Sequence, residues 1–236
     1  QALGFLFAVG LVIGGLMIRR QRYVVTAHTL CATGIVSLYA VTFACNSVYH
    51  FAFFGPLATF ALMSLITATA FVLAVRLGAP VVAILGILGG FLTPLLLSTG
   101  RDNPVGLFGY VALLNIGLIA VALRQRWHYL VTLGAVGTVL MQLGWAEKFL
   151  DATKSSTAML ICLAMCVLFL GAYFAAKKWS AGQPASPHLR WAAVAFPFVA
   201  FGFAAALLDY RAISAQPGRF FGFVLLADAC LLALAW

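Results

Sequence analysis

The chain consists almost entirely of apolar runs of about 20 residues, the length that spans a bilayer core about 30 Å thick as an α-helix. Short stretches between these runs hold nearly all of the charge. An unpaired backbone group in lipid costs several kcal/mol, so runs of this length must be helical. Hydrophobic residues make up 64% of the chain and charged residues only 8%, whereas soluble domains carry about 25% charge. The sequence therefore predicts an all-α, polytopic transmembrane helical bundle.

We expect about nine spans, in a single transmembrane helical domain that covers residues 1–236. Runs such as ALICLAMCVLFL do not alternate between polar and apolar residues, as the strands of a membrane β-barrel would. The chain begins inside an apolar run and without Met, so we expect an excerpt of a longer polytopic protein. The expected spans are residues 1–18, 23–45, 54–75, 79–99, 104–123, 129–146, 157–176, 191–208 and 220–236.

The distribution of Lys and Arg over the loops indicates the orientation. Of the 14 basic residues, nine lie in the loops after spans one, three, five and seven. Short cytoplasmic loops carry the excess of positive charge, so we expect the odd-numbered loops in the cytoplasm. The net charge of +9 is then explained by insertion of the chain into the membrane and by contact with anionic lipids of the bilayer. No basic stripe with interleaved aromatic residues indicates nucleic-acid binding.

The sequence offers little material for catalysis or for binding a metal or cofactor. The five cysteines all lie inside expected spans, which favours free thiols packed as small apolar side chains. Phosphate-binding loops, HExxH and GxSxG are absent, and the five acids are spread over separate loops and one span. We therefore expect no enzyme and no cofactor in this chain. The cysteines are Cys31, Cys45, Cys162, Cys166 and Cys230.

A weak internal repeat indicates that the bundle is built from helical hairpins. The tetrapeptide RQRY at residues 20–23 reappears 104 residues later as RQRW at residues 124–127. Each copy follows an apolar run that opens with a glycine and an aromatic residue, and each precedes another run. Both hairpins would enter the membrane in the same sense, which makes this a parallel repeat. Selection for basic loops and interfacial aromatic residues would also produce such a pattern.

Glycine positions predict both helix contacts and one irregular helix. Gly10 and Gly14, and likewise Gly86 and Gly90, have the four-residue spacing that lets two helices approach closely in lipid. In the fourth span, Pro94 removes a backbone donor and clashes with the carbonyl of Gly90, so we expect a kink there. This span forms either one bent helix or two half-helices. The kinked-helix region comprises Gly86, Gly89, Gly90, Thr93 and Pro94.

A resemblance to a known family rests on residues 89–115. The run GGFLTPLLLSTG at 89–100, then Asn103, LFGY at 107–110 and LLN at 113–115, resembles the core signature of a bacterial family of large predicted membrane proteins, domain of unknown function 2339. The resemblance implies a multi-pass protein of the bacterial inner membrane with more spans than this chain holds. It implies no established activity, so it carries over no site residues.

Polar residues within the spans are candidates for function, because ionisable groups in hydrocarbon are costly unless paired or hydrated. Asp228 lies near the middle of the ninth span without a local cation. Three alternatives are compatible with this position: the carboxyl group is protonated, it pairs with a group on another helix, or it faces water. Asn115, Gln142 and His28 are the other polar groups well inside spans, and each of them can instead bond a neighbouring helix.

The remaining acids lie near span ends that we expect outside the cytoplasm. Asp151 is spaced to meet Lys148 or Lys154 at the end of the sixth span. Arg101 with Asp102, and Asp209 with Arg211, are expected to form local ion pairs at the interface.

Three function classes follow. Movement of a small solute or ion predicts that Asp228, Asn115, Gln142 and the kink near Gly90 converge on one hydrated cavity. A structural or assembly subunit of an envelope complex predicts that they are dispersed, each with one neighbour, and that other membrane subunits or further spans of the same chain cover an exposed face. A lipid-modifying enzyme predicts clustered acids in a cleft. The sequence favours the first class, with the second as the alternative.

Overall fold

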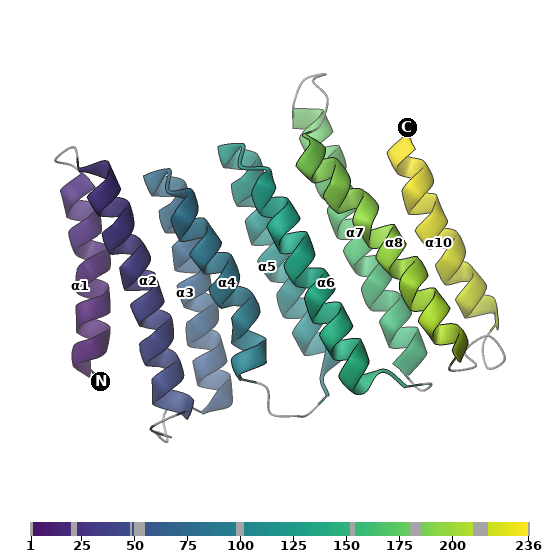
Figure 1. The fold of residues 1–236 in the computed structure, drawn as a ribbon, viewed down its shortest axis with the longest axis horizontal. Helices are drawn as coiled ribbons and strands as arrows, with labels where there is room; N and C mark the ends of the chain where they lie inside the picture. The colour runs from purple at the N-terminus through teal and green to yellow at the C-terminus, as the bar shows by residue number, and fades with distance from the viewer. Residues whose placement is uncertain are drawn as a thin grey trace. The chain divides into compact units, whose positions relative to one another are not determined.

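In the computed structural model, residues 2–19, 23–47, 49, 55–97, 102–151, 154–179, 186–209 and 217–235 are described. Within these ranges all regular structure is helical, which confirms the predicted fold class (Figure 1). The described helices are α1 (Ala2–Arg19), α2 (Val24–Ser47), α3 (Pro56–Leu77), α4 (Pro80–Leu96), α5 (Pro104–Gln125), α6 (Tyr129–Phe149), α7 (Ser155–Trp179), α8 (Pro187–Asp209) and α10 (Pro217–Ala235).

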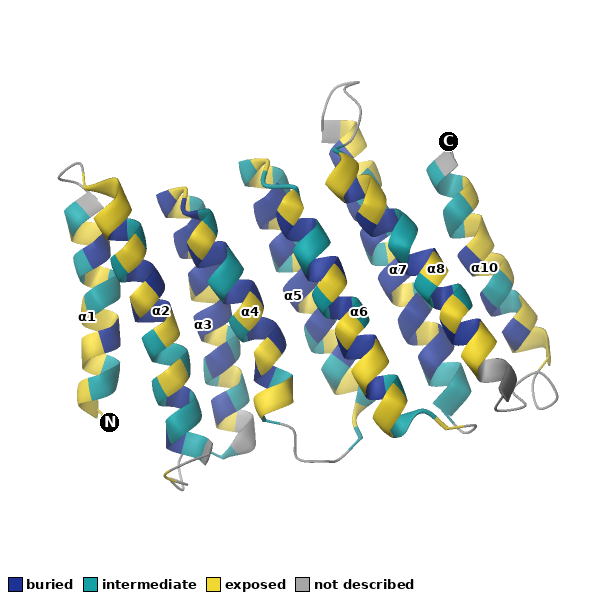
Figure 2. Ribbon diagram, in the orientation of Figure 1, coloured by how far each residue is buried: buried dark blue, intermediate teal, exposed yellow. Residues whose placement is uncertain are grey.

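Each expected span coincides with one described helix. Seven of these helices are long and apolar enough to cross a membrane, while α1 and α4 are shorter apolar helices. Five helices begin at proline, whose missing N–H costs nothing in a first helical turn. Buried and exposed residues alternate along the helices (Figure 2). Many of the exposed residues are large and apolar. Lipid is the solvent that such surfaces require, so the chain is an integral membrane protein.

The chain divides into two compact units, residues 1–101 and 102–236. In the first unit, α1 packs on α2, and α2 contacts both members of the α3–α4 pair. In the second unit, α5 packs on α6 and α7 on α8, while α5 contacts α7, α6 contacts α8, and α10 packs against α7 and α8.

The first four helices of the two units share a pattern of contacts. The pairs α1–α2, α3–α4 and α2–α4 correspond to α5–α6, α7–α8 and α6–α8. One proline lies inside the fourth helix of each set, Pro94 in α4 and Pro197 in α8. These observations support hairpins and a parallel repeat, although residues 20–22 of the repeated tetrapeptide lie outside the described residues.

The fourth span forms one helix and not two half-helices. Helix α4 runs without interruption from Pro80 to Leu96, and Pro94 lies in its last turn. The hydroxyl of Thr93 donates to the carbonyl of Gly89 at 2.7 Å, so Thr93 is satisfied within its own helix. Proline near a helix end disturbs few backbone bonds, which explains why the helix stays whole.

Glycines mediate the closest helix contacts in the first unit. Two of these glycines, Gly15 and Gly34, were not predicted from the sequence. A Cβ at Gly15 would lie 2.9 Å from the carbonyl oxygen of Ala27, and one at Gly34 would lie 2.9 Å from that of Ala8. The prediction for Gly10 and Gly14 is wrong within this unit, because no atom lies within 4 Å of a Cβ added at either position.

The predicted contact of Gly86 is confirmed. A Cβ there would lie 3.0 Å from the Cβ of Ala70 and 3.3 Å from the ring of Phe71, both on α3. Glycine at this position thus lets α3 and α4 approach closely.

Candidate functional site

Of the four intramembrane polar residues predicted as a site, the structure brings two onto one helix pair. Asn115 lies on α5 and Gln142 on α6, and both side chains are buried. His28 belongs to the first unit and Asp228 to the exposed side of α10. The candidate site therefore lies on the α5–α6 pair, and we call its residues Asn115, Thr138 and Gln142 the amide cluster.

Asn115 and Thr138 join the two helices by a hydrogen bond. The Nδ2 of Asn115 donates to the Thr138 hydroxyl at 2.7 Å and to the carbonyl of Val111 at 2.9 Å. The Thr138 hydroxyl in turn donates to the carbonyl of Gly134 at 2.7 Å. Thr138 was not among the polar residues predicted from the sequence. Its position one helical turn before Gln142, on the same face of one span, could have indicated it.

Three polar atoms of the amide cluster have no hydrogen-bond partner. They are the Oδ1 of Asn115 and both the Nε2 and Oε1 of Gln142, and the two residues are 0% and 1% exposed. Leaving a buried polar group unsatisfied costs about 1–3 kcal/mol. The predicted bond of Asn115 across helices is confirmed, whereas Gln142 makes no such bond among the described residues.

Gly134 lets the amide of Asn115 approach α6. A Cβ at Gly134 would lie 2.9 Å from the Oδ1 of Asn115 and 2.9 Å from a methyl group of Leu118. The unpartnered oxygen of Asn115 therefore rests against a glycine. A larger residue would have to displace it.

Two of the three residues of the amide cluster lie at mid-depth, whereas Gln142 lies seven residues before the end of α6, about 10 Å from it. Asn115 and Thr138 are each close to the centre of their helices, α5 (Pro104–Gln125) and α6 (Tyr129–Phe149). At 1.5 Å per residue, both lie about 15 Å from either helix end. In a membrane-spanning hairpin this depth corresponds to the hydrocarbon midplane.

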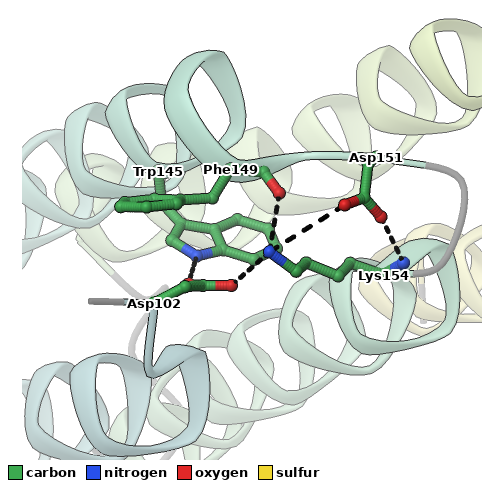
Figure 3. Close-up of polar contacts among 5 residues, drawn as sticks. All are labelled: Asp102, Trp145, Phe149, Asp151 and Lys154. Carbon is green, nitrogen blue, oxygen red and sulfur yellow. Dashed lines mark hydrogen bonds and ion pairs between the residues drawn. The ribbon is translucent and has the colours of Figure 1, made fainter. Parts of the chain in front are cut away.

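An ion pair lies near the C-terminal end of α6. The carboxylate of Asp102 accepts from the indole Nε1 of Trp145 at 2.8 Å and pairs with the Nζ of Lys154 at 2.6 Å (Figure 3). The ammonium group of Lys154 also donates to the carbonyl of Phe149 at 3.3 Å and lies 4.0 Å from Asp151. This cluster ties the segment before α5 to the segment before α7.

Two predictions about these charges have different outcomes. The pairing of Asp151 with Lys154 is confirmed. The expected partner of Asp102 was Arg101, but Asp102 pairs with Lys154 because the end of α6 lies beside the start of α5, and Arg101 lies outside the described residues. The expected pair of Asp209 with Arg211 also lies outside them, because Arg211 and the side chain of Asp209 are not described.

The ion pair shifts the pKa of both partners. Burial alone would raise the pKa of Asp102, but hydrogen bonds from Lys154 and Trp145, together with the charge of Lys154, lower it overall. The hydrogen bond to Asp102 raises the pKa of Lys154 against a smaller opposing effect of desolvation. Both groups are therefore charged at neutral pH.

Trp145 connects the ion pair to the amide cluster. It is buried, and its ring packs edge-on against Phe108 of α5 with centroids 5.7 Å apart. Gly134, Thr138, Gln142 and Trp145 recur every three or four residues and so form one stripe along α6. The stripe leads from the charged end of the helix pair, past an aromatic pair, to the unpartnered amides of the amide cluster.

His28 and the predicted kink region belong to the first unit, where they serve packing. The Nε2 of His28 donates to the carbonyl of Leu77 at 3.2 Å and so provides a hydrogen-bond partner for a carbonyl at the C-terminal end of α3. This agrees with the expected hydrogen bond to a neighbouring helix. Gly89 accommodates the ring of Tyr39, which a Cβ at that position would meet. The hydroxyl of Tyr39 bonds that of Thr67 at 2.6 Å.

Asp228 lies on an exposed side of α10. Among the residues that the structure describes, it makes no hydrogen bond or ion pair. The five cysteines are free thiols, and four of them are buried. Within the described ranges no group of three His, Cys, Asp or Glu residues could hold a metal ion.

Comparison with known proteins adds one decisive finding. The sequence model of a family described as predicted membrane protein (DUF2339) matches residues 2–236. The chain belongs to the DUF2339 family. This confirms the resemblance carried by residues 89–115, and the match extends over all nine described helices of this family member. Comparisons with curated proteins and with solved structures found no match.

Proposed function

We propose that this DUF2339 protein moves a small solute or ion across the membrane along the α5–α6 stripe. The observation that carries the proposal is the presence of three unpartnered polar atoms on two almost fully buried amides inside membrane-spanning helices. Unsatisfied buried amides destabilise the protein. A site that binds a passing polar species gives these groups a use that packing does not.

The chemistry of the amide cluster fits a small polar species. It offers two unpartnered amide oxygens as acceptors and one unpartnered NH₂ group as a donor. None of its three side chains carries a charge, so it suits neutral hydrogen-bonding solutes or a monovalent cation held by oxygen atoms. Movement of such a species involves no chemical step.

Flux into reconstituted vesicles tests the proposal. Permeability to protons, potassium, urea and glycerol would be measured for wild type, Gln142→Met and Thr42→Val. Thr42 is the matched control, because it is also buried with an unpartnered polar atom but lies in the first unit. We expect a wild-type flux of at least one probe, reduced about tenfold by Gln142→Met and unchanged by Thr42→Val. Wild-type fluxes equal to those of empty vesicles for all four probes would refute the proposal.

A role as a structural or assembly subunit is the second candidate. It is favoured by the dispersal of the predicted polar residues: His28 has its own partner in the first unit, and Asp228 lies exposed on α10. Such a subunit needs a surface that binds another membrane component, and that requirement can be tested separately from flux.

We further propose that the protein resides in a bacterial inner membrane with its odd-numbered loops in the cytoplasm. The basic residues at the ends of α5 and α7 support this orientation, because they include Arg124, Arg126, Lys177 and Lys178. In intact cells, a cysteine replacing Lys178 should resist a membrane-impermeant thiol reagent. A cysteine replacing Lys148 should react with it. The reverse pattern would overturn the orientation.

A further inference from the structure

The exposed side of α10 combines a carboxylate with an ordered row of large apolar side chains. Phe221, Leu225 and Leu232 are 57%, 68% and 62% exposed, and Asp228 between them is also exposed. The four positions are spaced by four, three and four residues. This is the spacing of the seam by which one helix packs along another at a shallow crossing angle. We call these four residues the α10 seam.

The α10 seam is distinct from the face that holds α10 in its unit. The buried positions of α10 include Phe220, Phe223 and Ala227, and α10 packs mainly against α7 and α8. Because residues 220, 223 and 227 form a row of their own, the helix has one face committed to the second unit and another that is open.

Lipid alone does not suit the α10 seam. Asp228 lies 11 residues after Pro217 and seven before Ala235, so it is about 10–16 Å from the ends of a helix that rises 1.5 Å per residue. A carboxyl group at this depth is costly unless it is paired, hydrogen-bonded or hydrated. Among the described residues it has no partner that would meet this cost.

A second copy of the chain would not supply the missing charge. In the described helices, Lys and Arg lie within a few residues of helix ends, and none lies near the centre of a helix. His28 lies in the second turn of α2 and donates to Leu77. A partner with a cation at mid-depth must therefore lie outside these helices.

We propose that the α10 seam binds a transmembrane helix, from outside residues 1–236, that carries a basic side chain at mid-depth opposite Asp228. The apolar residues of the seam would interlock with that helix, and the basic group would pair with the carboxylate. This goes beyond solute movement, because it assigns α10 an assembly role that is independent of the amide cluster.

Two model peptides test this proposal directly. Each is a transmembrane helix of leucine and alanine, with lysine at its centre in one and leucine in the other. Each fluorescent peptide is reconstituted with the labelled full chain in vesicles, and association is read from energy transfer. We expect the lysine peptide to bind wild type about tenfold more tightly than the leucine peptide.

Variants of the seam make the test specific. The preference for the lysine peptide should vanish with Asp228→Leu and shrink with Asp228→Asn, and circular dichroism of each variant checks that the helices are intact. Leu225→Ala on the seam should weaken binding, whereas Leu226→Ala, also an exposed leucine of α10 at 56%, should not. Equal binding of the two peptides would overturn the proposal, as would self-association of the chain that requires Asp228. Flux through the amide cluster is a separate readout and need not change with Asp228→Leu.

Discussion

The two units of this protein treat buried polar groups in opposite ways. In the first unit, the polar side chains between helices are mostly paired, as with Tyr39 and Thr67 or His28 and the carbonyl of Leu77. In the second unit, Asn115 keeps one buried polar atom and Gln142 two buried polar atoms without a partner. Helices of similar hydrophobicity therefore form one unit with a satisfied interior and another with spare hydrogen-bonding capacity.

Close packing accompanies the satisfied interior. In the first unit, Gly15 and Gly34 bring α1 and α2 together until a Cβ would meet backbone oxygen, and Gly89 accommodates the ring of Tyr39. The hydroxyl of Thr42 is the exception there, because it is buried without a partner. Close helix packing and unpartnered amide groups thus occur in different parts of the chain.

The largest effect is expected where the first unit is most closely packed. Gly15→Ala would place a Cβ 2.6 Å from the Sγ of Cys31 and 2.9 Å from the carbonyl of Ala27, so α1 and α2 must separate. We expect a loss of about 3 kcal/mol in the free energy of unfolding. Gly14→Ala is the control, since its Cβ meets open space, and it should change stability by less than about 1 kcal/mol. Similar losses for both variants would show that helix contact does not require Gly15. Reversible unfolding in mixed detergent micelles measures both.

Removal of a polar group should have opposite signs in the two units. Gln142→Met replaces unpartnered amide atoms by apolar ones of similar volume, and we expect it to stabilise the protein by about 1–2 kcal/mol. Thr67→Val removes the hydrogen bond between the hydroxyls of Tyr39 and Thr67, and we expect it to destabilise the protein by about 1 kcal/mol. Unfolding of both variants in the same micelles gives the comparison. A loss of stability with Gln142→Met would contradict the contrast between the units.

The ion pair of the second unit should give stability a dependence on acid pH. Asp102 has a lowered pKa in the folded protein, so its contribution is present above its unfolded pKa of about 4 and is lost as pH falls through the folded value. Asp102→Ala also leaves the indole N–H of Trp145 unpaired and should cost about 1–2 kcal/mol at neutral pH. The measurement is unfolding in micelles between pH 7 and pH 3.

Two variants separate charge from hydrogen bonding at this position. Asp102→Asn keeps an acceptor for Trp145 and should cost less than Asp102→Ala. Lys154→Met removes the cation and should reduce the loss of stability at acid pH. An unchanged pH profile in Lys154→Met would show that the ion pair is not its source.

The smallest effect is expected at His28. His28→Phe removes the donor to the carbonyl of Leu77 while keeping an aromatic ring. Hydrogen bonds between membrane helices contribute on average about 0.6 kcal/mol, so we expect a loss of that size. If the loss exceeded that of Thr67→Val, the ranking of polar contacts in the first unit would be wrong. Equilibrium unfolding measures the difference.

Sequence alone predicted the properties that depend on length and depth. A run such as residues 104–123 has only one compatible structure in lipid, and the depth of Asn115 or Gln142 follows from a rise of 1.5 Å per residue. One long-range contact, that of Gly86, also followed from spacing. The continuity of α4 could not be predicted from the sequence, because the effect of Pro94 depends on where the helix ends.

Partner choice could not be predicted, because it depends on how each helix is rotated about its axis. Gly14 and Gly15 differ by one residue and thus by 100° of rotation, and only Gly15 touches α2. The pairing of Asp102 with Lys154 depends on which helix ends meet, which no local pattern specifies. The same holds for Thr138, whose role appears only when α5 and α6 lie together.

If the amide cluster binds a polar species, water and small polar reagents must reach position 142. In a chain with its five cysteines replaced by alanine, cysteine is placed at position 142 or at position 42, and each variant is treated in vesicles with a small hydrophilic thiosulfonate reagent. We expect rapid modification at position 142 and slow modification at position 42. Equally slow modification at both positions would mean that the interior between α5 and α6 is closed to water, and would contradict the proposed binding of a polar species.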